Sequence, residues 1–251
     1  QWRWQTHLAN LPLYYEFKED TNYDNVILAG LNANEITFKY NKEFQNIFDL
    51  YINNSTTDKG LLSSKTVDDA MAEFALGKCA MVQNGNWGWA QVNGTDGNVT
   101  KAEDIKFLPI YTGMQGEETQ GICIGTENYF AINSQVDQAK QQASIDFLVW
   151  LFSSEEGKKA VTNDLGFITP FNTFEEDEQP TDPLAQEVLR WKAKESGEIV
   201  NPEWLFTAFP SEEFKNLFGA ALLEYVQDQK TWDEVTQTVI DAWASEKAAT
   251  A

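Results

Sequence analysis

The sequence predicts a helix-rich α/β fold. Apolar side chains recur at helical spacing behind capping residues along much of the chain, as in amphipathic helices. Three short apolar runs, at residues 79–82, 105–110 and 129–132, have the length of buried strands. A chain of 251 residues with 42% hydrophobic residues is long enough for one large domain or two small ones with a sizeable core.

The first part of the chain is expected to change from irregular to helical. Residues 2–15 mix aromatic and polar types and predict an irregular segment, and residues 20–25 predict a polar turn. A second helix is predicted from Thr66, a good cap, to Gly77, a good helix end. The first helix is predicted before it, behind a possible cap at Asn41. Its apolar residues, which recur at helical spacing, are Phe44, Ile47, Phe48 and Tyr51.

The middle of the chain combines predicted strands, a glycine-bearing connection and helices. Asn133 and Ser134 are expected to open a helix, and Ser153 with Glu156 forms a capping box for the next one. The apolar side of the first of these helices is Val136, Ala139, Ala143, Phe147, Trp150 and Leu151. The candidate hinge between the runs 105–110 and 129–132 contains Gly113, Gly116, Gly121 and Gly125.

Three helices are predicted for the last part of the chain. Asp182 followed by Pro183 is a helix-start pair, and Gly197 lies beyond the expected end of that helix. Ser211 can cap the next helix. Thr231 with Glu234 forms a capping box before the last one.

Composition narrows the function classes. With 39 acidic and 18 basic residues the net charge is −21, which repels phosphate backbones, so we expect no nucleic-acid partner. No apolar run approaches the ~20 residues that span a bilayer. Nine tryptophans and 13% aromatic content favour a carbohydrate ligand, because flat rings pack against the apolar faces of pyranoses. Two free thiols are expected at Cys79 and Cys123, although a disulfide between them stays open.

Catalytic and cofactor motifs are not found. The single histidine, His7, would have to serve any Ser-His-Asp or Cys-His arrangement, and no Gly-x-Ser-x-Gly elbow occurs. Asp20, Asn22 and Asp24 imitate the start of a calcium loop, but the glycine and glutamate that such a loop needs are missing. No phosphate loop or dinucleotide fingerprint is present. We therefore predict no catalytic residue, no cofactor and no metal site, although paired carboxylates leave a glycosidase open.

The stretch from Phe74 to Trp89 carries the strongest signal in the chain. It reads Phe74-Ala-Leu, Gly77-Lys78, then Cys-Ala-Met, and after a short interval Gly85-Asn86-Trp87. This order of residues resembles the signature of the extracellular solute-binding proteins of ABC importers, in the maltose-binding-protein-like, carbohydrate-type group. A second match begins at Phe130-Ala-Ile-Asn and continues through a helix to Ser154-Glu-Glu-Gly157.

The resemblance implies a type II periplasmic-binding-protein-like fold of two α/β lobes. Residues 1–112 would be the first part of the C-terminal lobe, and residues 113–172 the hinge crossing with a strand and helices of the N-terminal lobe. Residues 173–251 would be the closing helices of the C-terminal lobe. Since the family's chains start with a first lobe of alternating strands and helices, we expect an incomplete N-terminal lobe, with its early part missing from this sequence.

The same resemblance and the local sequence select candidate ligand contacts. Trp87 corresponds to the family's sugar-stacking aromatic, and Trp89 follows it on the same loop. Asn84 and Asn86 offer donors and acceptors for hydroxyls, although such residues also simply form turns. The remaining candidates are Asn10, Tyr14 and His7 in the opening segment, and Trp204 and Phe214 on either side of Pro210.

The predicted function is the capture of an oligosaccharide outside the membrane and its delivery to the transmembrane permease of an ABC importer, by a protein that is not an enzyme. Two alternatives remain: a glycoside-processing enzyme domain, or an importer binding protein for a peptide, a polyamine or another small solute. The family further implies a bacterial monomer, periplasmic or anchored to the cell surface as a lipoprotein. The sequence identifies neither the sugar nor its length and linkage.

Overall fold

The computed structural model describes residues 3–126, 129–195 and 199–250. The α-helices are α1 (Asn10–Lys18), α2 (Val26–Asn32), α3 (Asn41–Asn53), α4 (Val67–Ala75), α5 (Gly88–Asn93), α6 (Gln138–Ser153), α7 (Glu155–Lys159), α8 (Pro183–Ala193), α9 (Glu212–Val226) and α10 (Trp232–Thr250). Shorter π-helical and 3-10 segments are η1 (Arg3–Leu8), η2 (Lys59–Ser64), η3 (Glu117–Thr119), η4 (Ala160–Asp164), η5 (Glu176–Glu178) and η6 (Phe206–Ala208).

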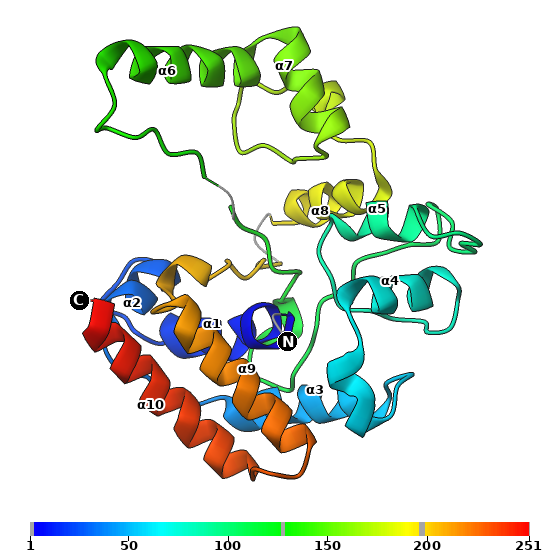
Figure 1. The fold of residues 1–251 in the computed structure, drawn as a ribbon, viewed down its shortest axis with the longest axis vertical. Helices are drawn as coiled ribbons and strands as arrows, with labels where there is room; N and C mark the ends of the chain where they lie inside the picture. The colour runs from blue at the N-terminus through cyan, green and yellow to red at the C-terminus, as the bar shows by residue number, and fades with distance from the viewer. Residues whose placement is uncertain (1–2, 127–128, 196–198, 251) are drawn as a thin grey trace.

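The main body is built from α1, α2, α3, α9 and α10 around one large hydrophobic core (Figure 1). Helices α9 and α10 pack side by side, and the first helices of the chain close the other side of this core. Trp243 is fully buried at its centre, and its indole Nε1 donates to the carbonyl of Ala33 at 2.8 Å. Elements from both ends of the chain therefore build a single body.

A smaller core joins α4 to α5. Met71 and Ala75 on α4 and Val92 on α5 are buried against one another. Thr66 caps α4 in a reciprocal capping box with Asp69, which explains why this helix starts where its apolar spacing does.

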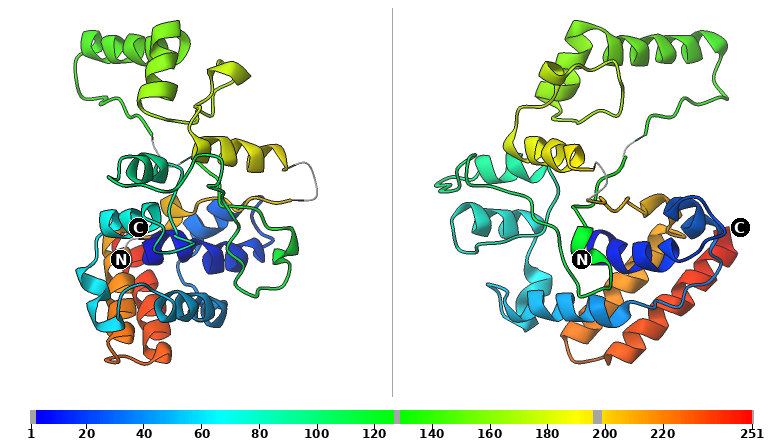
Figure 2. Two further views of the ribbon diagram at one scale, coloured as in Figure 1. Left: turned by 90° about the vertical axis from the view of Figure 1, so that its right-hand side faces the viewer. Right: turned by 180° about the vertical axis from the view of Figure 1, so that it is seen from behind.

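Helices α6 and α7 and the η4 segment lie apart from the main body, as Figure 1 shows and as Figure 2 shows from the side and from behind. Their small core contains Leu151, Val161 and Phe174. The apolar side of α6 is otherwise open: Phe147 is 53% exposed and Trp150 is 45% exposed. Of the residues predicted for the apolar side of this helix, Leu151 is buried, and Val136 lies before the start of α6. Apolar residues such as Ile145 and Val149 lie outside the predicted side, and nothing in the described residues covers most of the helix.

The three strand predictions are wrong in the part of the chain that the structure describes. Residues 79–82, 105–110 and 129–132 are extended or irregular and belong to no strand ladder. Met81 is 76% exposed and Phe130 is 62% exposed, and in the run 105–110 Ile105 is buried while Leu108 is exposed, so none of the three runs is buried throughout. A strand needs a neighbour to take up its backbone hydrogen bonds, and these segments run singly between helical parts.

One parallel bridge, between Gln120 and Val200, is the β-type pairing seen in the described ranges. Gly121 N donates to the carbonyl of Val200 at 2.8 Å, and further along Ile124 N donates to the carbonyl of Pro202 at 3.0 Å. The second half of the predicted hinge stretch therefore runs beside residues 200–202.

Helix-start predictions hold where the capping residue acts locally. Asp182 caps α8 by accepting from Leu184 N and Ala185 N, and Ser211 caps α9 by accepting from Phe214 N at 3.0 Å. Thr231 and Glu234 form the predicted capping box before α10. The expected helix end at Gly197 lies outside the described residues.

Three local predictions are wrong. The opening segment is not irregular, because η1 and α1 take it up, and Asn25 at the end of the predicted turn caps α2. Helix α6 begins at Gln138, capped by Asp137, rather than at Asn133 or Ser134. Ser154, not Ser153, caps α7, because the Ser153 hydroxyl instead donates to the Val149 carbonyl within α6.

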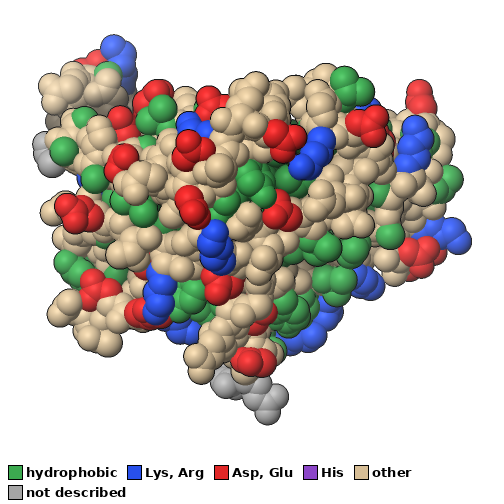
Figure 3. All heavy atoms as spheres, turned by 90° about the horizontal axis from the view of Figure 1, so that it is seen from below, with side chains coloured by type: hydrophobic (Ala, Val, Ile, Leu, Met, Phe, Trp, Pro, Cys, Tyr) green, Lys and Arg blue, Asp and Glu red, His purple; other side chains and the backbone are tan. Residues whose placement is uncertain are grey.

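The surface mixes charges of both signs. On the face drawn in Figure 3, acidic and basic side chains are interspersed with apolar ones, so the net charge of −21 does not form a single acidic patch there. Both cysteines are free thiols, which rules out the disulfide left open by the sequence. Among the described helices, none has the combination of length and apolar character that crossing a bilayer requires.

Candidate functional site

The first wall of the candidate site is the π-helical segment η1. It places His7 almost fully buried, with 6% of its surface exposed, between the main body and the loops above it. The ring nitrogen Nδ1 of His7 lies 3.4 Å from Nε2 of Gln83. Burial lowers the pKa of His7 to about 4, with the nearby Arg3 charge acting in the same direction. The imidazole is therefore neutral at physiological pH.

The second wall is the turn at residues 85–88, which follows Asn84. Gly88 N donates to the carbonyl of Gly85 at 3.0 Å, which closes the turn directly before α5. A methyl group on Gly85 would lie 2.2 Å from the indole ring of Trp87, so this ring folds over Gly85. Trp87 remains 41% exposed. The turn thus leaves part of the Trp87 indole open to solvent.

The third wall is the loop that carries Trp204. Asn10 is fully buried below it, and its side chain holds the backbone on both sides of Trp204: Nδ2 donates to the carbonyl of Glu203 at 2.9 Å, and Oδ1 accepts from Leu205 N at 2.7 Å. Gly125 allows a close approach from the other side, since a methyl group there would lie 3.1 Å from the nitrogen of Trp204. The loop is therefore fixed by contacts from distant parts of the chain.

The three walls bring four rings together. We call His7, Trp87, Trp204 and Phe206 the aromatic cluster. The His7 ring is 5.6 Å from the Trp87 ring, 5.2 Å from the Trp204 ring and 5.6 Å from the Phe206 ring, measured between centroids. Trp204 and Phe206 stack at 4.9 Å. Three candidates chosen from separate parts of the sequence are thus neighbours in space.

Phe206 is the member of the aromatic cluster that the sequence analysis missed. It lies two residues after Trp204, in the same stretch between Pro202 and Pro210 that marks Trp204 as a loop residue. The two prolines that mark this stretch as a loop could therefore have selected Phe206 as well. Its half-buried ring, stacked on Trp204, extends the aromatic surface.

The asparagine and tryptophan candidates beside the cluster have different surroundings. Asn86 is half-buried and directly precedes Trp87. Asn84 Nδ2 instead contacts Gln91 Oε1 at 3.0 Å and the Met71 sulfur at 3.1 Å, which ties the turn to α4 and α5. Trp89 packs against the small core between these two helices. Of these three, Asn86 is the one next to the exposed indole.

Two further candidates lie within the main core. Tyr14 is 6% exposed, and Phe214 is fully buried, 5.3 Å from the Trp243 ring between centroids. A ligand could not reach either side chain in this arrangement. Asn10 is equally buried, so its relation to the cluster is through the Trp204 loop that it holds.

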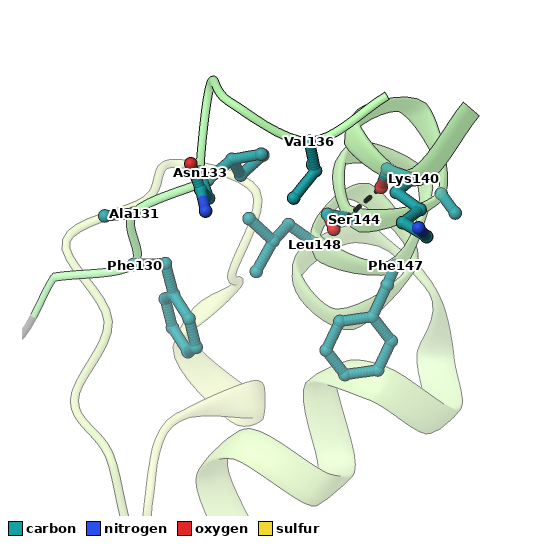
Figure 4. A pocket seen from close by; sticks show the side chains of 10 residues that line it. Phe130, Ala131, Asn133, Val136, Lys140, Ser144, Phe147 and Leu148 are labelled. Carbon is teal, nitrogen blue, oxygen red and sulfur yellow. Dashed lines mark hydrogen bonds between the residues drawn. The ribbon is translucent and has the colours of Figure 1, made fainter. Parts of the chain in front are cut away.

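The described residues contain no group of three or more His, Cys, Asp or Glu side chains placed to hold a metal ion. Two cavities are prominent, and neither is lined by a member of the aromatic cluster. One, of about 630 Å³, lies over the open side of α6, where Phe130, Phe147 and Leu148 project toward the same space (Figure 4). The other, of about 570 Å³, lies among η1, α3, α4 and α9.

Comparison with known families decides the class of protein. A family model described as bacterial extracellular solute-binding protein matches residues 2–187, well over half of the chain. The chain belongs to this family. A search of curated proteins gave no match.

As a bacterial extracellular solute-binding protein, the chain is the substrate-binding component of an ABC importer. Its partners are a small solute and the importer's permease, and its place of action is extracellular or periplasmic. Members of the solute-binding family generally bind their solute without transforming it. The resemblance drawn from the Phe74–Trp89 motif is confirmed at this level, and the family favours a periplasmic-binding-protein-like fold.

Proposed function

We propose that this solute-binding protein captures a carbohydrate on the aromatic cluster. The observation that carries the proposal is the grouping of Trp87, Trp204 and Phe206 around the neutral ring of His7. Aromatic faces stack on the C–H faces of pyranose rings, and indole N–H groups can donate to hydroxyls. A neutral cluster suits a neutral ligand such as an oligosaccharide.

Asn86 supplies the polar part of the proposed site. Its amide has two donors and one acceptor, which match sugar hydroxyls, and it precedes the exposed Trp87. The other sequence candidates act less directly: Asn10 and Asn84 hold the loops that carry Trp204 and Trp87. The proposed contacts are thus Trp87, Trp204, Phe206 and Asn86.

We further propose that the cluster is one wall of a cleft whose other wall belongs to an additional lobe. The support is the open apolar side of α6, where Phe147, Val149 and Trp150 are each at least 45% exposed. A helix that is apolar on most sides is normally covered by other parts of a protein. In this proposal residues 113–172 cross to that lobe and residues 1–112 and 173–251 form the lobe with the cluster.

In this proposal the two lobes close around the sugar, and the closed form delivers the sugar to the permease. A sugar held between them makes its full set of contacts only in the closed form, so binding shifts the population toward that form. Gly113 and Gly116, whose φ angles are +94° and +89°, lie at the start of the proposed crossing segment and adopt a backbone conformation that other residues rarely reach.

Calorimetry with a panel of oligosaccharides tests the ligand class. We expect saturable binding of at least one sugar, and Trp87→Ala should weaken it about tenfold, the order of one lost stacking contact. Trp150→Ala is the matched control, because Trp150 has a similar exposure, 45%, on α6. Equal effects of the two substitutions would sink the assignment of the site.

The same panel separates the alternatives. Release of reducing sugar during incubation would indicate a glycoside-processing enzyme, and saturable binding of a polyamine or peptide but of no sugar would indicate a non-sugar importer. For the chain alone we expect sugar dissociation constants on the order of millimolar, because half of the contacts are absent. Sub-micromolar sugar binding would contradict the additional lobe while supporting the sugar.

A further inference from the structure

The cavity of about 570 Å³ lies beside η1, with Arg3 and Gln83 among its lining residues. It is lined by residues of η1, α3, η2, α4 and α9, and a volume of this size is typical of small-molecule sites. None of its lining residues belongs to the aromatic cluster. It is therefore a separate candidate site.

The inner part of the cavity is apolar. Phe48 and Ile52 on α3 and Leu222 and Val226 on α9 line it, and each is less than a tenth exposed. Trp4 on η1 closes one side, with its ring 4.9 Å from that of Phe48. Such a surface takes up a hydrocarbon group and releases ordered water.

Arg3 gives the same cavity an uncompensated positive charge. Its guanidinium Nη1 donates to the carbonyl of Gln83 at 2.6 Å, and no carboxylate of the described residues lies within ion-pair distance of it. Burial lowers the pKa of Arg3 from its usual value, but the group stays charged. A partly buried guanidinium has four further N–H donors and favours a carboxylate, which it can bind in a bidentate manner.

The other charged residues at the cavity cancel each other. Lys65 Nζ lies 3.1 Å from Glu73 Oε1, and Thr56 also donates to Glu73. The hydrogen bond from Thr56, and after it the one from Lys65, hold the pKa of Glu73 below its usual value, so the carboxylate stays ionised and paired. The lining thus has a net positive charge in a protein of net charge −21. This local inversion of sign would attract a small anion.

Tyr51 adds a neutral donor beside Arg3. Its ring is 4.5 Å from the Trp4 ring, and burial raises the pKa of its hydroxyl to about 12. The phenol therefore keeps its proton at any physiological pH. Guanidinium and phenol together can satisfy a carboxylate better than either can alone.

We propose that this cavity binds a small amphipathic monocarboxylate, with the carboxylate on Arg3 and the hydrocarbon group on the floor formed by Phe48, Ile52 and Leu222. The ligand is held without any covalent step. This site is distinct from the proposed sugar site, because none of its lining residues belongs to the aromatic cluster, and Gln83 in the lining contacts His7 of that cluster.

Hexanoate and hexan-1-ol test the proposal on the unmodified chain, because each has a linear chain of six carbons and only hexanoate is charged. Calorimetry or ligand-detected NMR should show saturable binding of hexanoate at least about tenfold tighter than that of hexanol, the order of one charge-assisted interaction. Equal affinity for the two, or no saturable hexanoate binding up to tens of millimolar, would overturn the proposal.

Variants locate the binding. Arg3→Gln should weaken hexanoate about tenfold and leave hexanol unchanged, whereas Lys101→Gln, which removes a positive charge from an exposed residue outside the cavity, should change neither. Ile52→Trp fills the cavity and should abolish binding of both probes. Unchanged hexanoate binding in folded Arg3→Gln would refute the role of Arg3. If either variant does not fold, the comparison of the two probes on the unmodified chain decides alone.

Discussion

The Oδ1 atom of Asn10 accepts a hydrogen bond at 2.7 Å from the backbone N–H of Leu205, 195 residues further along the chain. Both groups are buried, and the same side chain donates to the carbonyl of Glu203. One amide thus fixes the backbone on both sides of Trp204. The geometry of the aromatic cluster depends on a residue that no ligand can reach.

Asn10→Ala should therefore lower stability and disturb the cluster. It leaves the buried N–H of Leu205 without a partner, which costs about 1–3 kcal/mol in free energy of unfolding. Urea denaturation measures the loss. Asn22→Ala is the control, because Asn22 is exposed and its side chain bonds only to its neighbour Asp20. Equal losses in the two variants would contradict a structural role for the buried amide.

His7 should make the protein less stable in mild acid. Its pKa is lowered from 6.5 to about 4 in the folded state, so between these values the unfolded chain binds more protons than the folded one. The contribution of His7 is fully present above pH 6.5 and is lost as the pH falls toward 4, to a total of about 3 kcal/mol.

Comparison with the His7→Gln variant separates the contribution of His7 to the pH dependence of stability from that of the many carboxylates that titrate in the same pH range. Urea midpoints measured between pH 4 and 7 should fall more steeply for the unmodified protein than for the variant. Parallel profiles would mean that His7 is protonated equally well in both states, so that burial does not lower its pKa in the folded protein.

The fold was predictable from the sequence where local signals decide it. The helices α4, α8, α9 and α10 start at capping residues that act on backbone groups three residues away, and such contacts are visible in the sequence itself. The predicted strands failed because pairing depends on a distant neighbour that no local pattern specifies. Residues 105–110 have strand-like composition yet no ladder partner in the described residues.

In the candidate site, too, local features could be read from the sequence, whereas contacts between distant parts of the chain could not. Trp87 was selected by its place in the family motif, where glycine and asparagine turn the chain beside it, and this turn forms. Phe214 was selected by its position after Pro210, but its place in the core is set by contacts with Trp243 that come from another helix. The cavity at Arg3 could not be predicted, because its lining comes from five helical segments spread over the chain.

Gly85→Ala should displace the indole of Trp87 with little cost in stability. The added methyl group would lie 2.2 Å from the ring, and since Trp87 is 41% exposed, the ring can swing into solvent. Sugar binding should weaken, and tryptophan fluorescence should shift toward the red as the indole becomes more exposed.

Gly60→Ala is the matched control, because a methyl group there meets no atom within 4 Å. Urea denaturation should place both variants within about 1 kcal/mol of the unmodified protein. Unchanged sugar binding in Gly85→Ala would show that the position of the Trp87 ring over Gly85 is not used in recognition.

Substitutions on α6 test whether its open side is exposed in solution. Phe147 is 53% exposed, so Phe147→Ser should change the free energy of unfolding by no more than about 0.5 kcal/mol, the usual range for surface positions. Leu151 is 8% exposed in the small core with Val161, and Leu151→Ala should cost about 2–5 kcal/mol. Serine and phenylalanine have similar helix propensities, so the comparison reports burial.

Thermal or urea unfolding at several protein concentrations gives the answer. If Phe147→Ser destabilises as strongly as Leu151→Ala at every concentration, this side of α6 is buried within the chain itself, and the additional-lobe proposal loses its support. If the loss appears only at high concentration, a second copy covers the helix. We expect the loss of stability in Phe147→Ser to stay small at every protein concentration, because the described residues leave this side of α6 open.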